Sequence, residues 1–294
     1  LFRSAISLLF MNQLNEEFNG QLSLAIQVFK GEYHRKFMLQ LISSQLDMDR
    51  MDYLKRDSFY SGVAEGNVNS ERLIQMMNVV DDVLVIEEKG IYSVEKFLMS
   101  RRLMYWQAYL HKTSLVAELI LTKVLKRAKE LTLKGVQLPC SEPLLFFMQN
   151  RIALENFDTN TLDFFSQLDD FDIISALKSW QRQDDFILSS LSKMIINRDL
   201  PKIKVVTDKL LLDEITPLQE RFATENDISV SDTAYFIFKG KIKNQAYSKE
   251  AEPIRILKKD RTIEDVVEAS DQLNLKSLSK LVTKYYICFP KQLV

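Results

Sequence analysis

The sequence predicts a mainly α-helical protein that ends in a small α+β C-terminal module. Apolar residues recur at helical spacing over most of the chain, and the 294 residues include only 7 Gly and 6 Pro. Near Leu200-Pro201 the apolar spacing changes to alternation, which is typical of strands. Hydrophobic residues make up 46% of the chain, so one large domain or two smaller ones can bury a sizeable core.

Residues 1–136 are predicted to form a helical core. Helices are expected over residues 4–17, 22–29, 47–57, 70–78 and 93–129. The Val- and Ile-rich stretch 79–87, followed by Lys89-Gly90 as a turn, predicts a small β-hairpin near 79–92. The stretch 93–129 contains no Gly or Pro, which predicts one long helix or a kinked pair.

The rest of the chain is predicted to form a helical extension, residues 137–200, and an α+β module, residues 201–294. In the extension, helices are expected over 144–149, 161–168, 173–183 and 186–197. In the module, we expect strands over 203–206, 233–238 and 284–289, helices over 211–223 and 275–281, and a hairpin of 253–257 with 261–265. Lys239-Gly240 is interpreted as a turn signal.

Composition and charge exclude several classes of protein. The net charge is −1, so there is no general basic field and nucleic acid is not indicated as a partner. Cys140 and Cys288 lie far apart and show neither metal nor redox spacing, which is typical of reduced thiols in a cytoplasmic protein. No apolar run reaches the length of a membrane span, so we expect no membrane association.

Several aspartates resemble a metal cluster when the sequence is read as a string: Asp158, Asp169, Asp170, Asp184 and Asp185. They fall at predicted helix starts and in loops. A carboxylate at a helix start accepts hydrogen bonds from free backbone N–H groups and complements the helix dipole. Helix capping therefore explains them better than metal binding.

The stretch 43–58, SSQLDMDRMDYLKRDS, carries the candidate site. In a helix that begins near Asp47, the side chains of Asp49, Tyr53 and Asp57 line one face, with Arg50 beside them. Carboxylates are hard oxygen ligands for metal ions, and the arginine guanidinium is a fixed donor fork for phosphate. From spacing alone, a salt-bridged and solvated helix face is the commoner explanation.

A second candidate face lies on the long helix predicted over 93–129. Arg101, Tyr105, Tyr109 and Lys112 share this face by helical angle. Composition alone favours a helix whose tyrosines pack while its cations extend to water.

The residues of these two stretches resemble those of the HD-domain phosphohydrolases. SSQLDMDRMDYLKRDS, followed by Gly62, Gly66 and Ser70-Glu71-Arg72-Leu73, is similar to the family stretch D-x-D-[KR]-x-D-Y-x-x-R-D. The nearest branch resembles the deoxynucleoside triphosphate triphosphohydrolases (dGTPase-like enzymes). The resemblance implies an HD-type helical bundle, of which this chain holds the C-terminal part, and a metal-dependent enzyme. The metal is one divalent ion among Mg, Mn, Fe, Zn and Ni.

The resemblance also implies roles for individual residues. Asp49 occupies the place of a metal ligand, and Arg50, Tyr53 and Asp57 occupy places that face the phosphates and the sugar. The segment RRLMYWQAYLHK resembles the family's second substrate helix, and its Arg101, Tyr109 and Lys112 would bind substrate. Because the register is inferred, Arg102 competes with Arg101 for the phosphate role.

The chain departs from the family in its histidines. The family's other metal ligands are a His and a His-Asp pair that precede the signature, whereas His34 and His111 are the only histidines here and neither precedes Asp. His34 stands before Arg35-Lys36 and is predicted to be a solvated surface residue. The missing histidines are expected upstream of Leu1. The chain is therefore either an N-terminally truncated enzyme or a relative that has lost the chemistry.

The expected function follows from the resemblance. We expect a phosphohydrolase that converts a deoxynucleoside triphosphate to deoxynucleoside and triphosphate, and that forms a homo-oligomer. Two alternatives stay open: a catalytically silent nucleotide-binding or assembly module with the same fold, and an HD phosphohydrolase that acts on other phosphate esters.

Overall fold

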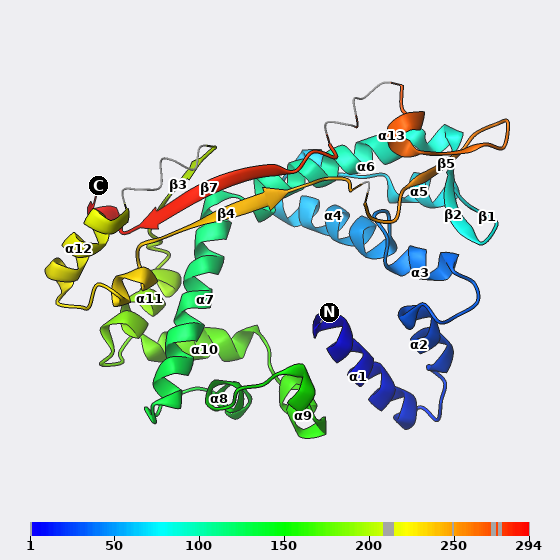
Figure 1. Cartoon of the computed structure of the whole chain (residues 1–294). Helices are drawn as coiled ribbons and strands as arrows, with labels where there is room; N and C mark the ends of the chain where they lie inside the picture. Colours follow the sequence, from blue (N-terminus) through cyan, green and yellow to red (C-terminus); the bar gives the residue numbers. More distant parts are fainter. Residues whose placement is uncertain (1, 208–214, 249, 272–274, 276–277, 294) are drawn as a thin grey trace. The chain divides into compact units, whose positions relative to one another are not determined.

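The structure is a computed structural model that describes residues 2–207, 215–248, 250–271, 275 and 278–293 (Figure 1). Its helices are α1 Phe2–Glu17, α2 Ser23–Lys30, α3 Phe37–Ile42, α4 Met48–Ser61, α5 Ser70–Gln75, α6 Ile91–Met104, α7 Lys112–Leu133, α8 Glu142–Gln149, α9 Thr159–Ser166, α10 Asp170–Trp180, α11 Phe186–Ile196, α12 Ile215–Asn226 and α13 Val266–Ala269. Its strands are β1 Met77–Val80, β2 Val83–Glu87, β3 Lys202–Val206, β4 Phe238–Asn244, β5 Arg255–Leu257, β6 Ile263–Asp265 and β7 Val282–Phe289. The predicted fold class, mainly α with small β elements, is confirmed. Among the described residues, no helix is long and apolar enough to cross a membrane.

The chain divides into two compact units, and each is discontinuous in sequence. Unit 1 contains Leu1–Phe10, Lys112–Ile242 and Lys284–Val294, and unit 2 contains Met11–His111 and Lys243–Thr283. The sequence-based division into 1–136, 137–200 and 201–294 is contiguous instead, and it stays a prediction.

The core of unit 2 lies where α4 packs against α6. Leu54 on α4 and Val94, Phe97 and Leu98 on α6 are completely buried, and Met51 is 2% exposed. Full burial of one such side chain contributes about 1.5–3 kcal/mol to folding. This apolar stripe fixes how α4 is rotated about its axis. Asp49 is exposed, Asp57 is half-buried, and the half-buried Tyr53 packs against the edge of this core.

Both ends of α4 are set by local signals. Asp47 caps the helix, and its Oδ1 accepts a hydrogen bond from the Arg50 backbone N–H at 2.8 Å. Gly62 ends the helix with φ 72°, a left-handed conformation that costs glycine little. The predicted start near Asp47 is confirmed.

The predicted β-hairpin is present, but its turn is elsewhere. β1 and β2 pair antiparallel, with Val80 opposite Val83, so Asp81 and Asp82 form the two-residue turn. Their φ values are 48° and 63°, the positive values that a tight hairpin turn of this length needs and that Asp tolerates. The prediction of a turn at Lys89-Gly90 is wrong: these residues lie in a short 3-10 helix that leads into α6.

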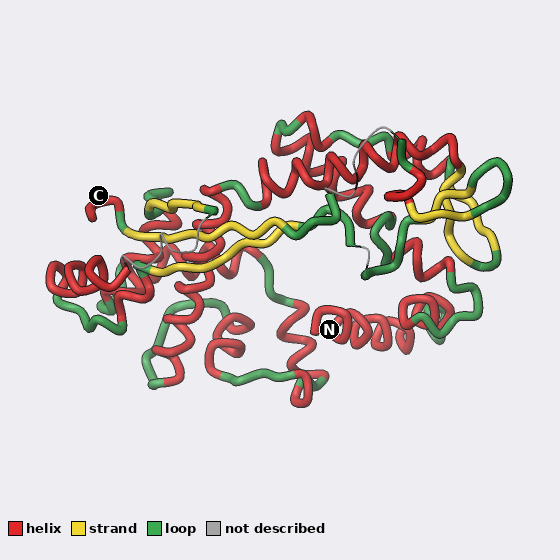
Figure 2. Tube along the Cα trace, turned by 45° about the horizontal axis from the view of Figure 1, so that its top comes forward, coloured by secondary structure: helices red, strands yellow, loops and turns green. Residues whose placement is uncertain are grey.

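The hairpin belongs to a four-stranded sheet of order β1-β2-β5-β6, and Figure 2 shows its strands in yellow. β2 pairs in parallel with β5, and β5 pairs antiparallel with β6, which confirms the hairpin predicted over 253–265. Unit 2 is thus completed by a segment that lies about 170 residues after the first hairpin.

Unit 1 is built around α7, α10 and α11. Ile120, Val124, Trp180, Leu188 and Leu191 are completely buried in its core. The aspartates predicted to be caps behave as such: Asp158, Asp169 and Asp185 are the N-caps of α9, α10 and α11.

A three-stranded sheet of order β3-β7-β4 follows, and two expectations for it are wrong. Residues 233–238 do not form a strand, because Asp232–Tyr235 is a 3-10 turn with buried Thr233 and Tyr235, and β4 starts only at Phe238. Gly240 is no turn but lies within β4, where a Cβ atom would come 2.3 Å from the Tyr286 hydroxyl oxygen. Glycine is needed here for that close packing.

Two predicted helices fall partly outside the described residues. Of the helix expected over 211–223, residues 211–214 are not described, and α12 begins at Ile215. Of the helix expected over 275–281, residues 276–277 are not described, and 278–279 form a turn.

Candidate functional site

The predicted face of α4 contains the candidate metal ligand and part of the candidate substrate site. Asp49 lies in the first turn of α4 and is exposed, and among the described residues its carboxylate has no hydrogen-bond partner. Tyr53 and Asp57 follow at intervals of four residues and are half-buried. The spacing therefore produces a wall that starts with a solvated carboxylate and continues with a phenol and a second carboxylate.

Asp57 is joined to the second predicted helix by a direct hydrogen bond. The Tyr109 hydroxyl donates to Asp57 Oδ2 at 2.7 Å. Tyr109 lies in a π-helical turn, Tyr105–Tyr109, in which the Leu110 N–H bonds to the Tyr105 carbonyl at 2.7 Å. Such turns are frequently found at functional sites, because the wider turn redirects side chains. Of the two predictions for residues 93–129, one long helix or a kinked pair, the structure has two helices, α6 and α7, separated by this π-helical turn.

Tyr53 of this wall forms an aromatic cluster with Tyr105 and Tyr109. The Tyr109 ring lies 6.2 Å from the Tyr53 ring and 5.2 Å from the Tyr105 ring, both edge to face. Burial, and then the hydrogen bond to Asp57, raises the pKa of Tyr109 above its usual value. Tyr109 therefore stays protonated at neutral pH and acts as a hydrogen-bond donor rather than a base. The sequence placed Tyr105 on the same helix face as Arg101 and Tyr109, but Tyr105 was not predicted to be a site residue.

Arg50 is held at the start of the wall. Its Nη1 donates to the Ser44 carbonyl and to Asp47 Oδ2. Asp47 is 1% exposed, so it is a fixed partner for the guanidinium. Among the described residues, the other Arg50 nitrogens have no partner and can donate to a ligand. The role of Asp47 in holding Arg50 was missed, although its i, i+3 spacing from Arg50 was a usable signal.

Arg101 approaches the same cluster from α6. Its Nη1 donates to the Ala246 carbonyl at 3.1 Å, and its buried Nε has no hydrogen-bond partner among the described residues. Burial raises the pKa of Tyr53, the neighbouring Tyr105 adds to this, and the positive charges of Arg101 and Arg50 oppose it. Both guanidinium groups therefore act electrostatically on the Tyr53 phenol, and the carboxylate of Asp47 acts in the opposite direction.

The structure thus brings most of the predicted site residues together in unit 2. Lys112 is the exception, because it begins α7 in unit 1 and is exposed. Arg102 lies on α6 next to Arg101 and is half-buried. His34 is exposed, as predicted, with its ring 4.3 Å from the Tyr33 ring.

The residues present do not by themselves fit a divalent metal. Within the described part of the chain, no group of three His, Cys, Asp or Glu side chains is arranged to hold an ion. Asp49 is a single exposed carboxylate, whereas a tightly bound catalytic metal needs several ligands.

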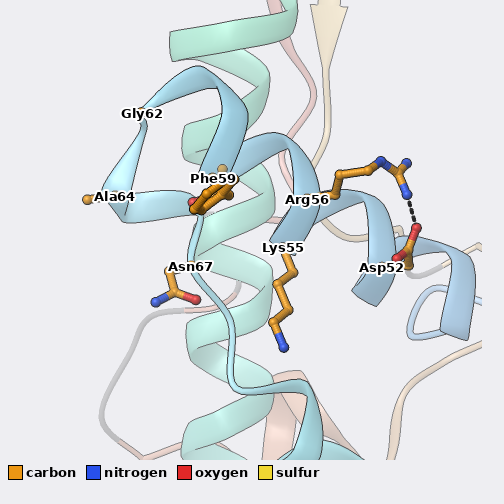
Figure 3. Close-up of a pocket in the computed structure, with 8 residues that line it drawn as sticks. Asp52, Lys55, Arg56, Phe59, Gly62, Ala64 and Asn67 are labelled. Carbon is orange, nitrogen blue, oxygen red and sulfur yellow. Dashed lines mark hydrogen bonds and ion pairs between the residues drawn. The ribbon is translucent and has the colours of Figure 1, made fainter.

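A surface depression of about 680 Å³ lies along another face of α4 (Figure 3). It is lined by Asp52, Lys55, Arg56, Ser58, Phe59, Gly62, Ala64 and Asn67. None of the predicted site residues lines it. The sequence analysis singled out no residue of this face except Gly62.

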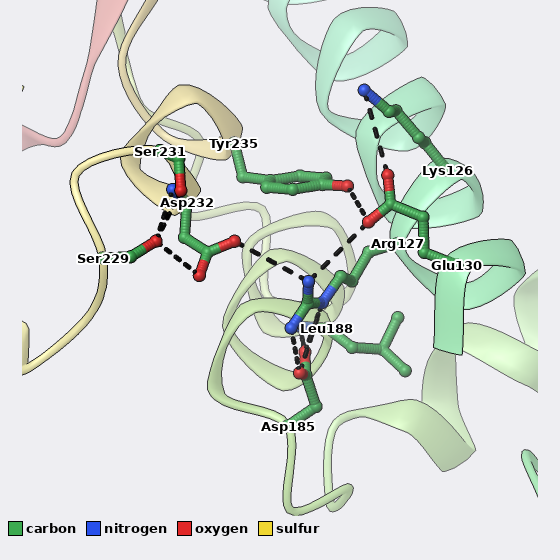
Figure 4. A network of polar contacts seen from close by, with 9 residues as sticks. All are labelled: Lys126, Arg127, Glu130, Asp185, Leu188, Ser229, Ser231, Asp232 and Tyr235. Carbon is green, nitrogen blue, oxygen red and sulfur yellow. Dashed lines mark hydrogen bonds and ion pairs between the residues drawn. The ribbon is translucent and has the colours of Figure 1, made fainter. Parts of the chain in front are cut away.

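A second polar cluster lies in unit 1 and is centred on Arg127 (Figure 4). Arg127 donates through Nε and Nη2 to Asp185, the N-cap of α11, at distances of 3.1 and 2.5 Å. Its Nη1 lies 3.7 Å from Glu130, which accepts a hydrogen bond from the Tyr235 hydroxyl at 2.6 Å. The cluster joins α7, α11 and the 3-10 turn before β4, so its role is structural.

Comparisons with known proteins show which family this fold resembles. The family described as "HD associated region" matches residues 68–137, which run from just before α5 to just after α7. A solved phosphohydrolase from Bacteroides thetaiotaomicron is 49% identical and superimposes with a TM-score of 0.91, over 97% of this chain and 71% of that chain. A hypothetical protein from Aquifex aeolicus, 20% identical with a TM-score of 0.64, covers 91% of this chain and 61% of that chain, and shows the same fold.

Two further proteins are similar to this chain in sequence. The uncharacterized protein YwfO of Bacillus subtilis is 39% identical over 59% of this chain. A Dictyostelium discoideum protein named deoxynucleoside triphosphate triphosphohydrolase SAMHD1 homolog is 24% identical over 40% of this chain and 24% of its own length. The chain spans 39% of the length of YwfO, so it matches only part of that relative.

The helical fold and these matches define a phosphohydrolase-type scaffold. The chain belongs to the HD-domain phosphohydrolase superfamily. Enzymes of this superfamily generally depend on a divalent metal ion.

Proposed function

We propose that this chain supplies the substrate wall of a nucleotide phosphohydrolase that converts a deoxynucleoside triphosphate to deoxynucleoside and triphosphate. The observation that carries the proposal is the cluster in which Tyr109 donates to Asp57 while Arg50 and Arg101 act on Tyr53. It combines cations for phosphates with a carboxylate and phenols for a sugar. The name of the Dictyostelium relative supports this substrate class.

In this proposal each side chain has one task. Arg50 and Arg101 bind phosphate oxygens and neutralise the negative charge that develops as the phosphate ester bond breaks. Asp57, oriented by the Tyr109 hydroxyl, accepts a hydrogen bond from the sugar, and the Tyr53 and Tyr109 rings pack against it.

Asp49 is the proposed metal ligand of this chain. A divalent ion held by Asp49 and further ligands would supply Lewis-acid chemistry at the phosphate and an activated water. Because the described residues offer no group of three ligands, the remaining ligands must come from residues other than these. The same observation favours a second candidate function, a module that binds nucleotides without hydrolysing them.

The proposal is tested by measuring how a non-hydrolysable deoxynucleoside triphosphate analogue binds to the chain. Arg101→Ala is expected to weaken binding about tenfold, because a charge-assisted contact contributes about 1.5–3 kcal/mol. Arg102→Ala is the matched control, with the same charge on the same helix, and should change binding by less than about twofold. Equal effects of the two substitutions, or no effect of either, would contradict the assigned wall.

A further inference from the structure

The buried turn before α4 is joined to a distant stretch of unit 2 by one side-chain amide. Gln45 is 7% exposed, and its Nε2 donates to the Ser248 carbonyl at 2.8 Å and to the Glu252 carbonyl at 2.9 Å. Its Oε1 accepts a hydrogen bond from the Ser248 N–H at 2.7 Å. The amide thus uses two donors and an acceptor on backbone groups, which neither a carboxylate nor a thioether of the same length can do.

The stretch that Gln45 holds carries the hydrogen-bond acceptor of Arg101. Ala246 is 2% exposed, and its carbonyl accepts from Arg101 Nη1 at 3.1 Å. Tyr247 is 1% exposed, and its hydroxyl donates to Asp265 Oδ2 at 2.5 Å. The backbone of 246–248 is therefore anchored on one side through Tyr247 and on the other side by Gln45. Its carbonyl groups have a fixed place, and one nitrogen of the Arg101 guanidinium is fixed with them.

The turn that carries Gln45 also holds Arg50. The Ser44 N–H donates to Asp47 Oδ2 at 3.1 Å, and the Leu46 N–H donates to the Ser44 hydroxyl at 3.2 Å. Arg50 Nη1 in turn donates to the Ser44 carbonyl and to Asp47. One buried turn therefore fixes Arg50 directly and reaches Arg101 through the Gln45 amide.

We propose that Gln45 is a positioning residue of the substrate wall, which places Arg101 so that it can bind the same polyphosphate as Arg50. The inference rests on the proposed function. Gln45 touches no substrate atom and acts through the 246–248 stretch. A guanidinium that is held in place before binding loses less conformational freedom when it binds, so it binds phosphate more tightly than one that moves. Without Gln45, Arg101 keeps its charge but loses its fixed position.

The test is Gln45→Met, which keeps the length of the side chain and removes its hydrogen bonds. Binding of the non-hydrolysable deoxynucleoside triphosphate analogue to the 294-residue chain is measured by calorimetric titration. We expect it to weaken about fivefold, less than the loss expected for Arg101→Ala, because the charge of Arg101 stays. If Gln45→Met changes nothing while Arg101→Ala weakens binding, the positioning role is refuted and the proposed function stands. If Arg101→Ala also changes nothing, the proposed function fails.

The matched control is Gln40→Met on α3. Gln40 also bridges distant segments, because its Nε2 donates to Glu252 Oε1 at 2.8 Å and its Oε1 accepts from the Leu84 N–H at 2.7 Å. Both substitutions should lower the stability of the chain, measured by denaturant unfolding, since each leaves backbone or side-chain groups without partners. Only Gln45→Met should weaken binding of the analogue by more than about twofold. Equal weakening by both would show that Gln45 merely stabilises unit 2.

A double-mutant cycle tests whether Gln45 acts through Arg101. In the Arg101→Ala background, Gln45→Met should have no further effect on binding, whereas in the Arg50→Ala background it should keep its full effect of about fivefold. An undiminished effect in the Arg101→Ala background would overturn the proposal. If Gln45→Met does not fold, Gln45→Asn replaces it in the cycle. Asn keeps the amide but is one methylene shorter, so it cannot reach all three backbone groups, and the same pattern is expected.

Discussion

The Tyr109 hydroxyl and the Asp57 carboxylate lie 2.7 Å apart although 52 residues separate them in the chain. This hydrogen bond joins the π-helical turn after α6 to the middle of α4. Burial and the bond itself raise the pKa of Tyr109, so the phenol keeps its proton and the bond persists throughout the neutral pH range. Asp57 therefore has a fixed orientation, which a residue that binds a sugar needs.

The substitution Tyr109→Phe removes this hydrogen bond and keeps the ring. In a protein that contains this chain and the other metal ligands, we expect kcat/KM to fall about tenfold. The reason is that a hydrogen bond to a charged group contributes about 1.5–3 kcal/mol. The loss should appear mainly in KM, since Asp57 is assigned to binding. Steady-state kinetics of the two proteins give the answer. A variant with unchanged KM and kcat would show that the bond is structural only.

Asp49→Asn and Arg101→Ala should lower activity for different reasons in a protein that contains this chain and the other metal ligands. Asp49 is the proposed metal ligand, so Asp49→Asn should lower both metal content and turnover. Arg101 is assigned to phosphate, so Arg101→Ala should keep the metal while raising KM or lowering kcat. Elemental analysis and kinetics on the same samples distinguish them. Full metal content and full activity in Asp49→Asn would remove the basis of the site assignment.

Turnover by the 294-residue chain alone should be close to background with Mn²⁺ or Mg²⁺ added. One exposed carboxylate cannot hold a catalytic ion in a defined geometry. A colorimetric assay for released triphosphate measures this directly. Efficient release by the purified chain would show that its own residues complete the site.

The Arg127–Asp185 pair predicts how the stability of unit 1 depends on pH. Burial alone would raise the pKa of Asp185, but the hydrogen bonds from Arg127 and from the Leu188 N–H outweigh it and hold the pKa below its usual value. A carboxyl group whose pKa is lower in the folded state stabilises the fold at pH values above its unfolded pKa of about 4. This stabilisation is lost as the pH falls through the folded-state pKa.

The substitution Asp185→Asn measures this contribution, because Asn can still cap α11 but carries no charge. We expect it to lower the free energy of unfolding by about 2 kcal/mol at pH 7. The difference from the unchanged protein should shrink as the pH falls below about 4. Denaturant unfolding at several pH values is the measurement. A difference that is constant with pH would mean that the charge of Asp185 does not stabilise the fold.

The sequence predicts the helices of this fold well because their signals are local. Asp47 and Gly62 mark the ends of α4, and the apolar positions Met51 and Leu54 fix its buried face. The β elements are predicted less well because they depend on distant partners. Gly240 resembles a turn residue until Tyr286 is seen to pack over it.

The site residues that follow from local signals are predictable too, whereas those that depend on distant partners are not. Asp49, Tyr53 and Asp57 follow from helical spacing, and their roles come from the family resemblance. A break in the helical stretch 93–129 was one of two predictions, but its position at Tyr105–Tyr109, which allows Tyr109 to reach Asp57, has no evident signal in the sequence. The sharing of Arg56 between Asp52 and Asp57 depends on side-chain geometry that spacing alone does not determine.

We propose that the wall on α4, with Arg101 of α6, serves the hydrolysis of deoxynucleoside triphosphates to triphosphate. The most direct measurement is product analysis, by ion-exchange chromatography, of a deoxynucleoside triphosphate digested by a protein that unites this wall with the missing metal ligands. We expect equal amounts of deoxynucleoside and triphosphate, and loss of both products in Arg101→Ala but not in Arg102→Ala. Release of orthophosphate or pyrophosphate instead, or hydrolysis of simple phosphate monoesters at a comparable rate, would contradict it.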